Sequence, residues 1–323
     1  MPKTLMCPVS LFEADVSGNV YIVTGGNSGV GFETVTQLAR QGAEVVLACR
    51  RLEAGQEAKA RVESLGVKGK VSILGLDLSS LESVRGFVQE FQKKYQRLDG
   101  LVNNAGIMNP PHSKTRDGFE LQFGTNHLGH FLLTELLLGT LKNTHGARVV
   151  NLSSCFHDKA MGREGRIDFE DLHYDRKKYD GWEAYAQSKL ANLLHARHLA
   201  LRLKGSGVTA VSVHPGWVRT NLISHSMPVW VQDVLLRPIL KLAGMIEPWE
   251  GAQSSLYALL SPEVPARSGS YFSQVGIYRN RDAAKGGWPL HSPNPHAHDD
   301  TLAEKLYQVS LRMVAPHLGI QPG

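Results

Sequence analysis

Apolar residues along the chain form short continuous runs that alternate with longer stretches of helical spacing. The short runs predict buried strands, and they cover residues 20–24, 44–48, 71–77, 98–104, 147–154 and 208–215. The longer stretches predict helices over residues 29–41, 52–65, 80–96, 117–143 and 182–204. This alternation predicts an α/β fold in which a doubly wound parallel sheet is covered by helices on both faces.

The last part of the chain departs from this pattern. Residues 268–272 could add a final strand, and a polar, turn-rich stretch after residue 280 precedes a predicted helix from Thr301 to Val314. No repeat or linker interrupts the chain before that stretch. The sequence therefore predicts one domain over residues 1–280 and a C-terminal extension, residues 281–323, packed on it.

Composition and charge narrow the class of protein. Of the 323 residues, 42% are hydrophobic and 20% charged, which is typical of a soluble globular protein. The net charge of +5 is spread along the chain, which favours an anionic small ligand over nucleic acid. Cys7, Cys49 and Cys155 lack a paired spacing, which favours a reducing compartment. With no signal-peptide pattern and no membrane-spanning apolar run, we expect a cytoplasmic protein.

Three glycines stand where the first strand meets the first helix. In "TGGNSGVG" they are Gly25, Gly29 and Gly31. Bare backbone lets a pyrophosphate approach closely, and the start of the helix offers free N–H groups. A tight turn without a ligand is the alternative. The other candidate contacts in this turn are Asn27, Ser28 and Val30.

Together with motifs further along, this glycine spacing resembles that of the short-chain dehydrogenase/reductase family. The motifs are "NNAG" at 103–106, "TNHLGH" at 125–130, "NLSS" at 151–154, "YAQSK" at 185–189 and "HPGWVRT" at 214–220. They match the family in order and spacing over roughly residues 18–275. The resemblance implies a Rossmann-type fold and an oxidoreductase that uses a nicotinamide cofactor.

The end of the second predicted strand bears on the choice of cofactor. In Rossmann-type folds an acidic residue there bonds the ribose 2′-hydroxyl, whereas arginine accommodates a 2′-phosphate. Here the strand ends with Arg50 and Arg51, so we predict NADP(H), with Arg50 as the main phosphate ligand. Two solvated arginines at a helix start are the alternative. Asp77, followed by Leu78, resembles the family's adenine-contacting position, and a helix cap is its alternative role.

Tyr185 and Lys189 are four residues apart on a predicted helix, so their side chains share one face. A nearby ammonium would lower the pKa of the phenol and make it a usable acid or base. The family resemblance implies that Tyr185 exchanges a proton with the substrate oxygen and that Lys189 also holds the nicotinamide ribose. It further implies that Ser154 bonds the substrate oxygen and that Asn126 holds a water linking Lys189 to solvent. Ser153 is the alternative serine.

The resemblance also implies further cofactor contacts. "NNAG" would pass under the cofactor, and "PGWVRT" would meet the nicotinamide carboxamide. A purely structural turn is the alternative for the first of these. The residues concerned are Asn103, Ala105, Gly106, Pro215, Gly216, Val218 and Thr220.

The 30 residues between Ser154 and Tyr185 resemble an insert of the retinol dehydrogenase branch and of the related WW-domain-containing oxidoreductases. Membrane-bound retinol dehydrogenases begin with an apolar anchor, whereas this chain begins close to its first predicted strand. The resemblance therefore leaves membrane residence and retinoid use open. Family members often form dimers, and a homodimer is possible here.

The stretch 229–246 reads as an apolar helix with one charged stripe, formed by Asp233, Arg237 and Lys241, and a kink at Pro238. It could be a lid over an apolar substrate, plain packing, or a membrane or partner contact. The tail histidines His291, His296 and His298 match no closed metal site, so we predict no metal. Cys155 is expected to be a small apolar filler.

These expectations converge on one function. The chain would be an NADP(H)-dependent oxidoreductase that transfers a hydride between nicotinamide and an apolar aldehyde, ketone or alcohol, such as a retinoid, a steroid or a lipid-derived carbonyl. The alternative is a catalytically weak NADP-binding signalling or scaffold protein with the same fold. Asn126, Ser154, Tyr185 and Lys189 together argue against that alternative, because a scaffold needs none of them.

Overall fold

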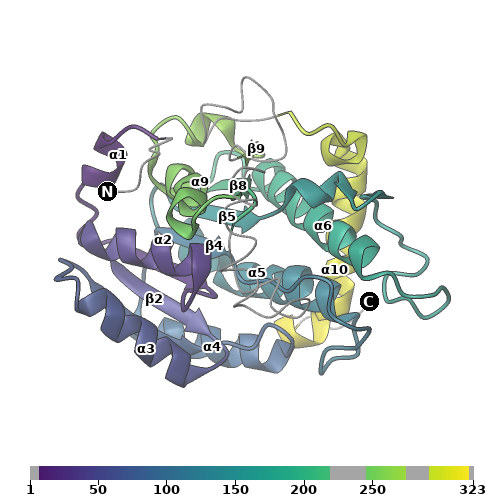
Figure 1. Ribbon diagram of the computed structural model, residues 1–323, viewed down its shortest axis with the longest axis horizontal. Helices are drawn as coiled ribbons and strands as arrows, with labels where there is room; N and C mark the ends of the chain where they lie inside the picture. Colours follow the sequence, from purple (N-terminus) through teal and green to yellow (C-terminus); the bar gives the residue numbers. More distant parts are fainter. Residues whose placement is uncertain (1–6, 219–244, 274–290, 320–323) are drawn as a thin grey trace.

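A parallel sheet of seven strands forms the centre of the protein (Figure 1). The computed structural model describes residues 7–218, 245–273 and 291–319. The strand order is β3-β2-β1-β4-β5-β8-β9, and every neighbouring pair is parallel. The predicted α/β, doubly wound fold is therefore confirmed. The strands are β1 (Val20–Thr24), β2 (Glu44–Cys49), β3 (Lys70–Gly75), β4 (Gly100–Asn103), β5 (Arg148–Leu152), β8 (Thr209–His214) and β9 (Tyr271–Ser273).

The sheet order places the candidate site. The chain runs outward from β1 to β2 and β3, then returns so that β4 lies on the other side of β1. At such a reversal the connections from β1 and β4 leave in opposite directions, which opens a crevice at the carboxyl ends of the strands. The glycine turn follows β1 and the "NNAG" segment contains the end of β4. Both motifs therefore meet at this crevice.

Helices cover both faces of the sheet. On one face α2 (Gly29–Arg40), α3 (Leu52–Glu63) and α9 (Pro248–Leu260) pack on one apolar cluster. On the other face α4 (Leu81–Lys94), α5 (Gly129–Lys142) and α6 (Gly181–Arg202) share a second cluster. The sequence analysis did not anticipate α9. Its start carries Pro248 in the first turn and a capping box between Glu247 and Glu250, a recognisable helix start.

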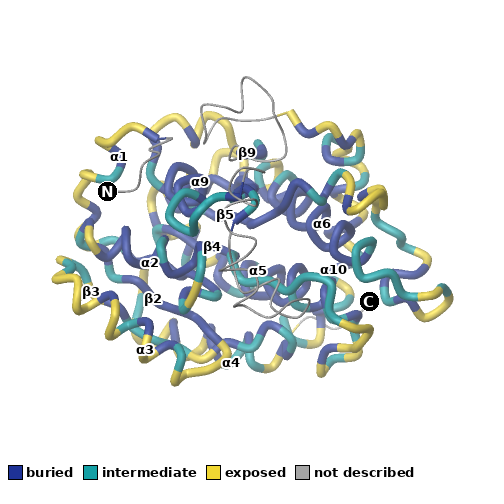
Figure 2. The backbone as a smooth tube through the Cα atoms, viewed as in Figure 1, coloured by how far each residue is buried: buried dark blue, intermediate teal, exposed yellow. Residues whose placement is uncertain are grey.

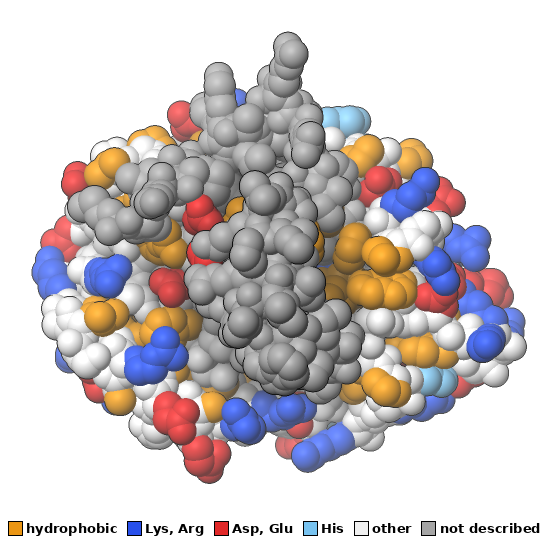
Figure 3. Space-filling model, in the orientation of Figure 1, with side chains coloured by type: hydrophobic (Ala, Val, Ile, Leu, Met, Phe, Trp, Pro, Cys, Tyr) orange, Lys and Arg blue, Asp and Glu red, His pale blue; other side chains and the backbone are white. Residues whose placement is uncertain are grey.

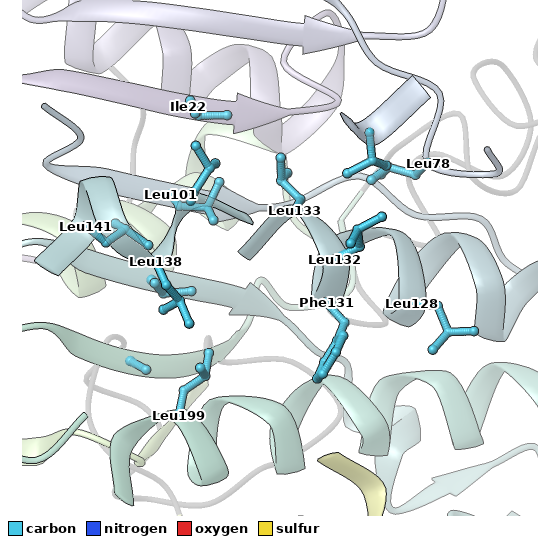
Figure 4. Close-up of a cluster of buried hydrophobic side chains, with 14 of the residues drawn as sticks. Ile22, Leu78, Leu101, Leu128, Phe131, Leu132, Leu133, Leu138, Leu141 and Leu199 are labelled. Atoms are coloured by element: carbon cyan, nitrogen blue, oxygen red, sulfur yellow. The ribbon is translucent and has the colours of Figure 1, made fainter. Parts of the chain in front are cut away.

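The second cluster forms the larger core (Figure 4). Phe131, Leu132 and Leu133 of α5 are fully buried, and their side chains lie between the sheet and α6. Full burial of each such side chain contributes about 1.5–3 kcal/mol. The same layering is visible in Figure 2, where α5, α6 and the strands are mostly buried and α3 and α4 turn exposed residues outward. This packing fixes α6, which carries Tyr185 and Lys189, and α5, which follows directly after the turn that contains Asn126.

The helix predicted over 117–143 differs from the one observed. A π-helical turn, Phe123–Leu128, precedes α5, and residues before it form a loop with a bridge between Lys114 and Glu120. A π turn inserts one extra residue into the helical ladder and is frequent at functional sites. Here it contains Asn126.

The end of the chain packs on the same face as α5 and α6. A short 3-10 turn, Pro295–His298, leads into α10 (Asp300–Leu318), which contacts α4, α5 and α6. This helix is longer than the predicted 301–314. No described helix is long and apolar enough to cross a membrane. The predicted lid at 229–246 falls almost entirely on residues 219–244, outside the described residues, as does Thr220.

Candidate active site

The glycine turn joins β1 to α2 at the crevice. The N–H of Gly25 donates to the Ala48 carbonyl of β2 (2.8 Å). Gly25 and Gly29 have φ of +63° and +55°, a region that favours glycine. A Cβ on Gly31 would overlap the carbonyl oxygen of Gly25. The closure of the turn itself thus explains Gly31, whereas Gly25 and Gly29 are explained by their positive φ, and Gly25 also by its close approach to Ala105.

The start of α2 has free hydrogen-bond donors. Its N-cap, Ser28, is extended and makes no side-chain capping bond. By contrast, α4, α6 and α10 are capped by the side chains of Ser80, Asp180 and Asp299. Uncapped N–H groups at a helix start attract an anion. The residues around this start that we proposed as contacts, Asn27 and Val30, lie in the same turn.

Thr24, which the sequence analysis did not single out, ties the glycine turn to the segment after β4. Its Oγ1 accepts from the N–H groups of Asn104 and Ala105 (2.9 Å each). The Asn104 amide donates to the Thr24 carbonyl (2.7 Å), and a ring nitrogen of His130 on α5 bonds Thr24 Oγ1 (2.8 Å). Its role could have been predicted from its position at the end of the first strand, directly before the glycines.

Asn103 stands at the end of β4, in the segment that was predicted to pass under the cofactor. It is buried, and its amide donates to Thr134 (3.0 Å) and Asn151 (2.8 Å) inside the protein. The amide nitrogen of Asn103 therefore ties β4 to β5 and α5. Gly106 is different: a Cβ there would lie 3.3 Å from both Asn126 Oδ1 and Lys189 Nζ. The small residue keeps the space beside Lys189 open.

Asn126 anchors the segment after β4. Its Oδ1 accepts from the Ile107 N–H (2.8 Å), and its amide donates to the Ile107 carbonyl (2.9 Å) and to Ser188 on α6 (3.0 Å). The main-chain carbonyl of Asn126 meets a ring nitrogen of His130 (3.0 Å). The Asn126 side chain and main chain are thus both held in place by bonds within the protein.

Tyr185, Lys189 and Ser154 come together at the carboxyl end of β5. Tyr185 and Lys189 lie in the first turns of α6, with Lys189 Nζ 5.5 Å from the centre of the tyrosine ring. Lys189 Nζ also donates to the Leu152 carbonyl (3.2 Å). Ser154 lies close enough to the Tyr185 hydroxyl to lower the pKa of that phenol. The phenol, the amine and the serine hydroxyl thus share one buried site.

The expectation that Lys189 lowers the pKa of Tyr185 is wrong for this structure. Burial raises the pKa of Tyr185, and the hydrogen bond from Ser154 offsets only part of that rise. Burial likewise lowers the pKa of Lys189 to about 8. Desolvation disfavours the charged form of either group and outweighs their mutual attraction here. At neutral pH Tyr185 is therefore protonated and able to donate.

The structure separates the two candidate serines. Ser153 Oγ donates to the main-chain carbonyl of Lys189 (2.8 Å). Ser154 Oγ accepts from the Phe156 N–H (3.2 Å) and faces Tyr185. Ser153 therefore holds α6 against β5, and Ser154 is the serine at the site. Cys155 is buried, and its pKa is raised to about 11 by desolvation, which fits the expected role as an apolar filler.

Arg50 and Arg51 follow directly after the end of β2. Both are exposed, and Arg51 is the N-cap of α3. Among the described residues neither guanidinium has an ion-pair partner. Asp77 is engaged instead: its Oδ1 accepts from the N–H (3.0 Å) and hydroxyl (2.6 Å) of Ser79, so it shapes this turn. The cap of α4 is Ser80, and Leu78 is buried against Gly129 of α5.

The segment after β8 closes the crevice. Gly216 has φ of +90°, and Val218 forms a parallel bridge with Ile246. A Cβ on Gly251 of α9 would lie 2.5 Å from Val218 Cγ2, 3.0 Å from the Pro215 carbonyl oxygen and 3.2 Å from Val30 Cγ2. Gly251, which sequence reasoning missed, therefore lets this segment approach the glycine turn.

An aromatic wall, Phe156 and Trp182, stands beside Tyr185. The Phe156 ring lies edge-on to Trp182 (centroids 5.7 Å apart) and to Tyr185 (6.1 Å). Both wall residues are partly exposed. Figure 3 shows hydrophobic side chains gathered on this face over the first turns of α6. The Tyr185 ring therefore lies beside a partly exposed apolar surface.

The tail histidines form no metal centre in the part of the chain that the structure describes. His291 and His298 stack with centroids 4.0 Å apart, and His298 bonds the Ser292 carbonyl (2.9 Å).

Comparison with known proteins agrees with this geometry. Residues 19–166 match the family model described as short chain dehydrogenase. Retinol dehydrogenase 12 of Bos taurus is 43% identical over 94% of this chain and 88% of its own length. Retinol dehydrogenase 13 of Homo sapiens is 40% identical over 96% and 89%.

Solved structures show the same fold. An uncharacterized protein from Mycobacterium paratuberculosis is 34% identical, with a TM-score of 0.72 over 94% of this chain and 95% of that chain. Pseudomonas aeruginosa RhlG, solved as an NADP complex, matches with a TM-score of 0.62 and 24% identity over 81% of this chain and 96% of its own. The chain therefore belongs to the short-chain dehydrogenase/reductase family of oxidoreductases, in its retinol dehydrogenase-like branch.

Proposed function

We propose that this chain is an NADP(H)-dependent oxidoreductase that interconverts apolar aldehydes or ketones and their alcohols. One observation carries the proposal: a buried phenol, beside Ser154, lies one helical turn from a buried amine at the carboxyl end of the sheet. Tyr185 and Lys189 are only 6% and 4% exposed. Burying two ionisable side chains disfavours their charged forms, and such groups are typical of catalytic sites.

The chain fits a nicotinamide dinucleotide at this crevice. The glycine turn and the uncapped start of α2 suit a pyrophosphate, and the space kept by Gly106 lies beside Lys189 Nζ. When bound, the nicotinamide supplies or takes up the hydride. The proposed cofactor contacts remain those named from the sequence, Asn103 and Asp77 included.

The protein's own groups handle the oxygen and its proton. A carbonyl oxygen becomes negative as hydride arrives, so donors that face it stabilise the transition state. Tyr185, protonated at neutral pH because burial raises its pKa, donates the proton. Ser154 provides a second hydroxyl, and Lys189 a positive charge beside the phenol. In alcohol oxidation Tyr185 accepts the proton instead.

Arg50 and Arg51 support NADP(H) over NAD(H). They follow β2 at the position that meets the adenosine ribose in such folds, both are exposed, and neither is engaged in an ion pair within the described residues. A free guanidinium at this place suits a 2′-phosphate, because its planar fork matches phosphate oxygens. We keep Arg50 as the main ligand.

The substrate class follows from the wall beside Tyr185. Phe156 and Trp182 offer partly exposed aromatic surface next to the reacting hydroxyl. Apolar, extended carbonyl compounds bury surface against such a wall. The relatives named retinol dehydrogenases support retinoids as one candidate within this class.

A substrate panel tests the proposal. Retinal, a steroid ketone and a medium-chain aldehyde are each supplied with NADPH or NADH, and cofactor oxidation is followed by absorbance. We expect turnover with at least one of them and a preference for NADPH. Binding of NADPH without oxidation by any substrate would instead favour a cofactor-binding scaffold.

A further inference from the structure

The C-terminal segment 291–298 reaches back to the loop that carries Ser154. Ser292 and Asn294 are 2% and 1% exposed although prolines surround them. Both bond to residues more than 125 positions earlier in the chain. The segment therefore serves as more than a connection to α10.

His157 connects this segment to the candidate catalytic serine. Its ring is fully buried, with Nδ1 2.6 Å from the Ser154 carbonyl oxygen and Nε2 2.5 Å from Ser292 Oγ. A carbonyl only accepts, so Nδ1 carries the proton and Nε2 accepts from the Ser292 hydroxyl. Burial lowers the pKa of His157 to about 4, so the ring is neutral at physiological pH and keeps this tautomer.

Asn294 holds the same loop at two further points. Its amide donates to the carbonyls of His157 and Gly165 (2.8 Å each), and its Oδ1 accepts from the His296 N–H (2.9 Å). Its own N–H donates to Ser292 Oγ (3.1 Å). Ser292 Oγ thus accepts one bond and donates another, and both side chains are fully satisfied. Such complete networks specify one geometry.

We propose that His157 and Ser292 are positioning residues for Ser154, so that the C-terminal segment is a working part of the active site. The inference rests on the proposed function only in assigning Ser154 its role at the substrate oxygen. The main-chain carbonyl of Ser154 accepts a hydrogen bond from His157, and the side chain of Ser154 lies at the Tyr185 hydroxyl. The hydrogen bond from His157 therefore fixes the backbone from which the serine hydroxyl meets the phenol.

The effect on catalysis would exceed the effect on binding. Small errors in the placement of a reacting group can cost orders of magnitude in rate, whereas the glycine turn and the arginines lie on other elements and keep their geometry. Loss of the Ser292 bond would therefore lower kcat and leave the affinity for NADPH unchanged. A defect limited to stability would change neither.

The test compares Ser292→Ala with Ser310→Ala. Ser310, on α10, is also fully buried, and its hydroxyl bonds Nε2 of His127 (2.8 Å). Ser310→Ala therefore removes the same type of hydrogen bond as Ser292→Ala, at a place outside the Ser154 loop. We expect Ser292→Ala to lower kcat for carbonyl reduction by about tenfold or more, with the Kd for NADPH unchanged. We expect Ser310→Ala to lower the Tm about as much as Ser292→Ala does, but to keep kcat within about twofold of the wild-type value.

Two further readouts separate positioning from stability. In alcohol oxidation the active form of Tyr185 is the phenolate, and the Ser154 hydroxyl lowers its pKa. Ser292→Ala should therefore shift the alkaline rise of kcat to higher pH. His157→Asn retains a donor for the Ser154 carbonyl and should recover part of the rate lost in His157→Phe. An unchanged kcat and pH profile in Ser292→Ala would overturn the proposal.

Amide hydrogen exchange tests the link without turnover. The N–H groups of His157, Asp158 and Gly165 bond within the loop, so Ser292→Ala should speed their exchange and Ser310→Ala should not. If the wild-type protein reduces no carbonyl, the proposed function fails and exchange alone decides this inference. Faster exchange then supports the link, and unchanged exchange overturns it.

Discussion

Two parts of the crevice to which we assign roles in one reaction have opposite environments. Tyr185 and Lys189 are only 6% and 4% exposed, and partners hold both. Arg50 and Arg51 are exposed and have no ion pair among the described residues. Packing positions the first pair before any ligand arrives. The ligand itself must order the second pair.

This difference has energetic consequences. Burial shifts the pKa values of Tyr185 and Lys189 in opposite directions, because each charged form loses its hydration. The arginines keep their hydration until they meet an anion, so their gain comes from binding. Changes at the buried pair should alter the rate, and changes at the exposed pair should alter the choice of cofactor.

The largest effect is expected for Tyr185→Phe. Removing the hydroxyl removes the proton donor, and we expect kcat to fall by about a thousandfold or more, with the Kd for NADPH nearly unchanged. Steady-state kinetics and NADPH fluorescence measure the two quantities. The control is Tyr257→Phe, which removes a hydroxyl on α9 that bonds Glu263, after the end of that helix (3.0 Å). Retained turnover in Tyr185→Phe would refute the assigned role.

The two adjacent serines should separate cleanly. Ser154→Ala removes a donor to the developing negative charge and should lower kcat by roughly a hundredfold. Ser153→Ala removes a bond to the Lys189 carbonyl and should cost about 1 kcal/mol in unfolding free energy, with a much smaller change in kcat. Urea unfolding and initial rates distinguish them. A large loss of kcat in Ser153→Ala, with only a loss of stability in Ser154→Ala, would assign the catalytic role to Ser153.

Arg50→Glu should change specificity and leave the chemistry intact. Reversing the charge beside the 2′-phosphate should lower the ratio of kcat/KM for NADPH over NADH by at least about tenfold. kcat with saturating NADH should stay near its wild-type value. The control, Arg267→Glu, reverses an exposed charge after α9. An unchanged ratio of kcat/KM for NADPH over NADH would indicate that Arg50 is a solvated surface residue without a role in cofactor choice.

The smallest expected effect is on pH dependence. Lys189 has a pKa of about 8, so reduction should slow roughly fourfold between pH 7 and pH 8.5 as its charge is lost. Lys189→Met should be slower and should lack this decline. Stability changes in the opposite sense: because the pKa is depressed in the folded state, this group adds stability as pH rises from about 8 toward 10.5. A flat profile for the wild type would contradict the assignment.

The elements predicted from the apolar pattern were mostly found, with errors at informative places. The six buried strands all formed, because continuous apolar runs between turns have few other ways to bury themselves. The predicted helix start at residue 117 was wrong, since residues 117–120 form a loop and a π turn follows, in which Asn126 contacts Ile107 and Ser188. The helix α9 was missed although its capping box was legible.

The sequence by itself determined the family, the α/β order and the candidate residues, because these depend on spacing along the chain. Tertiary structure alone decided which serine faces Tyr185, that burial raises the pKa of the phenol, and that Ser292 bonds His157. Each of these depends on groups brought together from distant segments. Local residue patterns cannot encode the desolvation or the hydrogen-bond partners that such contacts create.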